Sequence, residues 1–200
     1  MLNTKKGANL LNKIFKKFIF CKIFFIFVIL NNASNSQEIR DLEKSINELT
    51  AEANQGNVDA QYSLGRIALE NKNPPDHSGA AYWFRIAAES NHIESQEILG
   101  ALLFSGLGVP PNPKEAYIWW KKAALSGSVK AQASLGVLYA LGSGVEKSSI
   151  HAYKWLTIAA FFGNKNAQVQ RDESVALQMT ADEIRTAQQL VEETIKNIKK

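Results

Sequence analysis

The three histidines, His77, His92 and His151, are the residues best suited to bind a metal ion. A metal site on one helix uses two histidines spaced three or four residues apart, because that spacing puts both rings on one face. None of the three has a second histidine at that spacing. His77 is expected in a loop, His92 at a helix start and His151 on a helix. The sequence therefore predicts solvated or capping histidines, with no metal or cofactor.

Other catalytic patterns are missing from the sequence as well. No serine lies in a G-x-S-x-G turn, which would expose a nucleophilic hydroxyl, and the only cysteine is Cys21. The segments "GLG" (106–108) and "GSG" (142–144) contain glycines suited to binding phosphate. Neither has a lysine and a hydroxyl residue directly after its last glycine, so both are expected to be helix-ending turns. We therefore predict that the protein is not an enzyme.

The N-terminal segment 1–36 differs in composition from the rest of the chain. It has six lysines and no acidic residue, and the apolar run Ile23–Leu30 precedes small and polar residues. This order predicts a secretory signal peptide, cleaved before Gln37 or at a second possible site at Ala33. The run is shorter than the ~20 apolar residues that span a bilayer as a helix. An uncleaved N-terminal anchor is the alternative.

Cleavage would change the charge of the protein. Removing six of the 23 basic residues leaves 17 against 19 acidic ones, a formal charge of −2. A nucleic-acid-binding domain needs a basic face, and the clustered lysines would be lost with the leader. The sequence therefore predicts no nucleic-acid partner, and membrane attachment only if the leader is retained.

The rest of the chain contains a repeat. Trp83, Trp119 and Trp155 recur at intervals of 36 residues, within the similar segments "AAYWFRIAAES", "EAYIWWKKAAL" and "HAYKWLTIAAF". Each segment follows another shared one, whose glycine is Gly65, Gly100 or Gly136. A repeat of this length predicts a solenoid of stacked helical hairpins. An apolar stripe from Ile39 to Ala53 predicts an opening helix over 37–56, before the first repeat.

The shared residues have an expected structural role. Glycine inside a helix costs roughly 1 kcal/mol relative to alanine, so its recurrence predicts close packing against the next helix. The three tryptophans stand among alanines on one helical face, which predicts core positions. Thr180 and Glu183 have the spacing of a capping box, which predicts the start of a C-terminal helix.

The third repeat, with "AQASLGVLYALGSGV" followed by "AYKWLTIAA", resembles the Sel-one-like repeat (SLR) family, relatives of tetratricopeptide (TPR) repeats. The resemblance implies an all-α fold, an α/α superhelical solenoid of antiparallel helix pairs. It covers three repeats in 57–162 (57–90, 91–126 and 127–162), then a capping repeat and C-terminal helix in 163–200. The first repeat departs most, because Ala68 replaces the aromatic residue found at Tyr139.

Partner contacts are expected where the copies differ, since shared positions hold the scaffold. On the first helices we identified as differing positions Tyr62, Arg66, Glu97, Lys130 and Gln132. Similarity to tetratricopeptide arrays implies that these helices line a concave face. Tyr62, Arg66 and Glu97 are therefore the candidate partner-binding residues.

Three functions are compatible with these observations. The resemblance favours a secreted or periplasmic adaptor, a protein-binding scaffold that holds a protein or peptide without catalysis. Family precedent also leaves open an envelope enzyme or a cell-wall-ligand protein that acts on β-lactams or peptidoglycan. A membrane-tethered assembly factor would follow if the leader is not cleaved.

Overall fold

The computed structural model describes residues 36–70 and 74–198, and the predicted leader, 1–36, lies outside them except for Ser36. Contacts divide the chain into two units, 1–52 and 53–200, which are described separately. The described part of the first unit is helical and belongs to α2 (Ser36–Asn54), in the segment where the apolar stripe predicts an opening helix.

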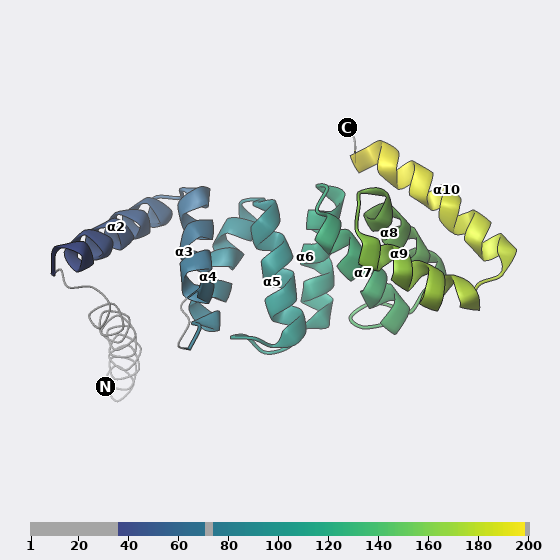
Figure 1. Ribbon diagram of the computed structural model, residues 1–200, viewed down its shortest axis with the longest axis horizontal. Coiled ribbons are helices and arrows are strands. Elements are labelled where there is room, and N and C mark those ends of the chain that lie inside the picture. Colours follow the sequence, from purple (N-terminus) through teal and green to yellow (C-terminus); the bar gives the residue numbers. More distant parts are fainter. Residues whose placement is uncertain (1–35, 71–73, 199–200) are drawn as a thin grey trace, which may run out of the picture. The chain divides into compact units, whose positions relative to one another are not determined.

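The second unit contains six helices of 13 residues each, followed by a C-terminal segment (Figure 1). The six helices are α3 (Val58–Glu70), α4 (His77–Glu89), α5 (Ile93–Ser105), α6 (Pro113–Leu125), α7 (Val129–Leu141) and α8 (Ser149–Phe161). They pack as the hairpins α3/α4, α5/α6 and α7/α8, and each hairpin also contacts the next. The predicted all-α solenoid of stacked helix pairs is confirmed.

Polar side chains set the helix starts. The Asn112 carboxamide accepts a hydrogen bond from the Glu115 backbone N–H at 3.1 Å, with Pro113 as the first residue of α6. This arrangement satisfies one of the backbone donors that the first turn leaves unpaired. His77, which was expected in a loop, is instead the first residue of α4. The corresponding caps of α4, α7 and α8 are Asp76, Ser128 and Ser148.

Each repeat glycine lies directly against the second helix of its own hairpin. A Cβ atom on Gly136 would lie 2.6 Å from Leu156 Cγ and 3.2 Å from the Leu156 backbone nitrogen. Cβ atoms on Gly65 and Gly100 would lie 2.7 Å from Phe84 Cε1 and 2.5 Å from Trp120 Nε1. The prediction that these glycines permit close packing against the next helix is therefore confirmed.

In the second and third hairpins, the loop between the two helices packs against the preceding hairpin. Gly108 has φ +74° and lies so close to the His77 backbone that a Cβ atom would overlap it. Gly144, with φ +72°, approaches the backbone of Pro113 in the same way. Each loop thus contacts the start of the second helix in the preceding hairpin. Only glycine combines this backbone conformation with the absence of a side chain.

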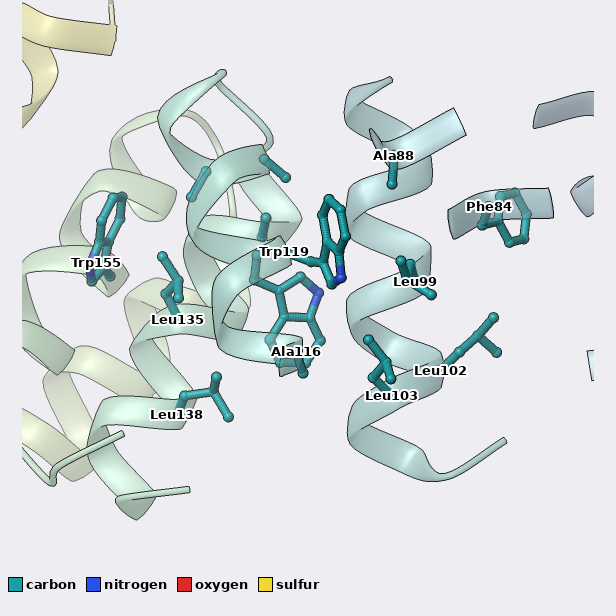
Figure 2. Packing of buried hydrophobic residues seen from close by; sticks show 14 of the residues in the cluster. Phe84, Ala88, Leu99, Leu102, Leu103, Ala116, Trp119, Leu135, Leu138 and Trp155 are labelled. Carbon is teal, nitrogen blue, oxygen red and sulfur yellow. The ribbon is translucent and has the colours of Figure 1, made fainter. Parts of the chain in front are cut away.

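The three repeat tryptophans do not share one environment. Trp119 and Trp155 are buried, with 7% and 3% of their surface exposed, and Figure 2 shows Trp119 pointing toward the helix that carries Leu99. Trp119 also donates from Nε1 to Glu115, whose carboxylate pairs with Arg85 in the preceding hairpin. Trp83 is only partly buried, so the expected core position is wrong for this residue. It belongs to α3/α4, the first of the hairpins that the structure describes.

The C-terminal segment departs from the repeat. Helix α9 (Lys165–Gln170) has six residues and continues into a π-helical turn (Arg171–Val175) and a 3₁₀ turn (Ala176–Gln178). Helix α10 (Ala181–Ile198) then packs on α8, burying Ala187 and Val191. Its start is the predicted capping box: Thr180 N donates to Glu183 Oε2 at 2.8 Å, and Glu183 N donates to Thr180 Oγ1 at 3.3 Å.

Candidate binding surface

The first helices α3, α5 and α7, together with α9, form one row, which we call the first-helix face. Tyr62 on α3 is half-buried, and its ring lies 4.5 Å from the His92 ring, centroid to centroid. His92 is the residue that caps the start of α5, the next first helix. The Tyr62 side chain therefore fills the junction between the first two repeats.

Arg66 lies one turn further along α3 and is exposed. Its Nε donates to Glu70 Oε1 at 3.0 Å, and its Nη1 donates to the Tyr62 hydroxyl at 3.4 Å. The hydrogen bond with Glu70 is the main reason that the pKa of Arg66 lies above its ordinary value. The guanidinium is accessible, but its charge is already matched within α3.

Glu97 holds the second junction together. Its Oε2 accepts a hydrogen bond from Ser128 Oγ at 2.7 Å, and its Oε1 lies 3.2 Å from Lys130 Nζ. Its backbone carbonyl accepts from Trp120 Nε1 at 3.0 Å. Only 19% of the Glu97 side chain is exposed, whereas 82% of Lys130 is. Glu97 thus connects α5 with α6 and α7.

Gln132 is not a differing surface residue, contrary to our sequence-based assignment. It is completely buried and aligns with Gln61 and Gln96, which directly follow the shared Ala60 and Ser95. Each glutamine donates from Nε2 to a backbone carbonyl of the helix before it, at 3.0 to 3.1 Å. Gln96 donates to Ala88 on α4 and Gln132 to Ala124 on α6. Gln61 donates to Ala53 on α2. The signal was present in the sequence as a glutamine shared by all three repeats.

A pocket of about 310 Å³ opens at the third junction, between α7 and α9. Its apolar lining comes from four helices, and Ser134 and three carboxamides supply the polar groups. The lining residues are Phe104, Trp120, Ala133, Ser134, Val137, Leu138, Asn164, Asn166, Ala167 and Gln170. None of them is charged. The sequence analysis did not identify this site, and Tyr62, Arg66 and Glu97 are not among its residues.

One pair of side chains resembles part of a catalytic site. Ser148 Oγ lies 2.9 Å from His151 Nδ1, and burial lowers the pKa of His151. The same hydroxyl accepts from the His151 backbone N–H at 3.3 Å, as the cap of α8. His151 also stacks on Tyr139, with ring centroids 4.9 Å apart. These contacts assign the pair to capping and packing.

The part of the chain that the structure describes contains no group of three or more histidine, cysteine or acidic residues placed to hold a metal ion. No helix within those same residues combines the length and the hydropathy needed to cross a membrane.

Comparison with known proteins agrees with this architecture. A crystal structure of a protective antigen from uropathogenic Escherichia coli strains, which displays an SLR fold, has a TM-score of 0.70 and 30% sequence identity. That match covers 78% of this chain and 33% of the antigen, so this chain spans a third of the length of that protein. A Sel1 repeat protein from Oxalobacter formigenes has a TM-score of 0.57 and 32% identity, covering 67% of this chain and 98% of that one.

No protein of curated function matches the sequence. The family model for the Sel1 repeat matches three consecutive segments, 58–92, 93–128 and 129–160. These segments contain the three hairpins, with their shared glycines and second-helix tryptophans. The chain belongs to the Sel1 repeat family.

Proposed function

We propose that this protein is an exported, non-enzymatic scaffold that holds a protein or peptide partner on its first-helix face. Sel1 repeat proteins are commonly scaffolds for protein–protein interaction. The observation that carries the proposal is the uncharged pocket on this face, between α7 and α9. A solenoid of this kind presents its extended surface to partners, while its shared residues stack the repeats.

The distribution of shared and differing residues supports this division. The glycines and glutamines common to all repeats are buried between helices, where they contact the neighbouring helix. Arg66 and the aligned Ala101 differ between copies and face outward on the first helices. A surface whose residues vary while its backbone repeats is suited to recognising one particular partner.

Export is supported by the composition of segment 1–36, with its six lysines, its apolar run and its small residues near Ser36. Intact-mass measurement of the protein recovered from its natural host tests this part of the proposal. A chain beginning near Gln37 is expected in the periplasmic or secreted fraction. A full-length chain in the membrane fraction would instead show a tethered protein.

Site-specific photo-cross-linking in the host tests the scaffold role. A benzophenone amino acid is placed at Ala101, exposed on α5, and separately at Ile118, exposed on α6, as a control for the second-helix face. Discrete protein adducts are expected from Ala101 and not from Ile118. Repeated absence of adducts from Ala101 and from further first-helix positions would contradict the proposed binding face.

A further inference from the structure

The three junctions between successive first helices are built from the same two aligned positions. One is the capping residue of the following first helix, which is His92, Ser128 or Asn164. The other lies near the middle of the preceding first helix and is Tyr62, Glu97 or Ala133. The side chain at the second position determines whether the junction is filled.

At the first two junctions this side chain reaches the cap. The Tyr62 ring packs against the His92 ring at 4.5 Å, and the Glu97 carboxylate accepts from the Ser128 hydroxyl at 2.7 Å. Ala133 has only a methyl group, which cannot extend across the third junction to Asn164. Both Ala133 and Asn164 line the pocket there. The pocket is therefore the space that a longer side chain occupies in the first two repeats.

From this comparison we infer that the third junction takes up a large apolar or aromatic side chain from an uncharged segment of the partner protein. The inference rests on the proposed scaffold function and names the chemistry of its partner. The segment supplies in trans what Tyr62 supplies within the chain at the first junction.

The size of the pocket favours a single side chain. Pockets that enclose small molecules range from about 300 to 1,000 Å³, and this one, at about 310 Å³, lies at the lower end. It is partly open to solvent, so a peptide backbone can remain outside while one side chain enters. Phe104, Trp120 and Val137 provide the apolar contacts for that side chain.

The polar groups at the pocket match a peptide backbone. Asn164 Oδ1 accepts from the Ala167 backbone N–H at 3.0 Å, and this cap does not use the Asn164 Nδ2 donor. Asn166 and Gln170 add two more carboxamides, each able to donate to a carbonyl and accept from an N–H. A charged side chain that lost part of its hydration here would find no counter-ion among the lining residues, which is unfavourable. The lining therefore selects an uncharged segment.

Selection from a phage-displayed library of random peptides on the immobilised full chain tests the inference. Peptides with an uncharged stretch around one large apolar or aromatic residue are expected to be enriched. Fluorescence anisotropy with the synthesised peptides then measures their dissociation constants. Enrichment of charged peptides without such a residue, or no enrichment at all, would overturn the inference.

The Ala133→Tyr variant places the side chain of the first junction at the third one. It should weaken binding of the selected peptides at least tenfold, whereas the matched variant Ala51→Tyr, at an exposed position of α2, should leave it unchanged. Circular dichroism tests whether both variants are folded. If Ala133→Tyr does not fold, Val137→Lys tests the same pocket by adding a charge to its wall. Unchanged binding by the folded pocket variant would refute the assignment.

The cross-linking experiment separates this inference from the scaffold function. If Ala101 still yields adducts in a chain that carries Ala133→Tyr, while the wild-type chain selects no peptide, the scaffold stands and the pocket assignment fails. If peptides bind the pocket but no first-helix position yields an adduct in the host, the proposed scaffold function fails instead.

Discussion

Gly136 on α7 lies against Leu156 on α8 so closely that even the Leu156 backbone nitrogen would be 3.2 Å from a Cβ atom on the glycine. At the glycines of the first two repeats, the three atoms nearest to a Cβ atom belong to the rings of Phe84 or Trp120. A side chain can turn aside, but the backbone of a packed helix cannot without separating the hairpin. Gly136 therefore leaves no room for a side chain between α7 and α8.

Gly136→Leu should destabilise the protein strongly. Overpacking a core typically costs about 1–3 kcal/mol, and the clash with the α8 backbone places this variant at or above the upper end. Thermal unfolding measures the effect, with Ala101→Leu as the matched control on the exposed side of α5. An unchanged melting temperature for Gly136→Leu would show that the two helices are not in close contact.

Trp119→Ala should lower the free energy of unfolding more than Trp83→Ala does. Trp119 is 7% exposed and hydrogen-bonds Glu115 at 3.2 Å, so its truncation should cost about 3–5 kcal/mol. Trp83 is only partly buried, so its truncation to alanine should lower the free energy of unfolding clearly less. Urea unfolding of the two variants gives both free energies. Equal losses would mean that Trp83 packs as tightly as Trp119.

Glu97→Ala should lower stability by about 1–3 kcal/mol, since the Ser128 hydroxyl loses its acceptor at the second junction. Lys130→Ala should cost less than about 1 kcal/mol, because the lysine is 82% exposed and water screens its charge. Chemical denaturation of the two single variants and the double variant of Glu97 and Ser128 gives the coupling free energy between these residues. Additive effects would indicate that the hydrogen bond does not contribute to stability.

Glu115 should make the stability of the protein sensitive to acid. The hydrogen bond from Arg85 is the main cause that lowers the pKa of this carboxyl below its ordinary 4.5. A carboxyl whose pKa is lower in the folded state stabilises the fold above its unfolded pKa, and this contribution is lost as the pH falls through the folded value. The difference in unfolding free energy between wild type and Glu115→Gln should therefore be constant above about pH 6 and decrease below pH 4.5. A difference that does not change down to pH 3 would contradict this assignment.

The glycines show how much of the fold was predictable. Gly65, Gly100 and Gly136 recur at fixed places within a helical pattern, and glycine is unfavourable there unless another helix comes close. Periodicity and local chemistry thus predicted the hairpins, and the capping box of α10 followed from the spacing of Thr180 and Glu183. These features depend on residues that are near one another in the sequence.

The surface residues were less predictable. Gln132 was assigned as a differing position, although the same glutamine occurs in all three repeats and is buried. Glu97 was selected because its copies differ, and the structure shows that it also connects two repeats. Variation between copies identifies positions outside the shared core, but it does not distinguish a contact between hairpins from a free surface.

The sequence alone determined the class of fold and the number of repeats, because helical periodicity and capping act within a few residues. Only the tertiary structure decided which junction is open. Ala133 lies 31 positions before Asn164 in the chain and becomes its neighbour only when the hairpins stack. A repeat alignment shows that Ala133 is short, but only between two packed helices does the missing volume become a pocket.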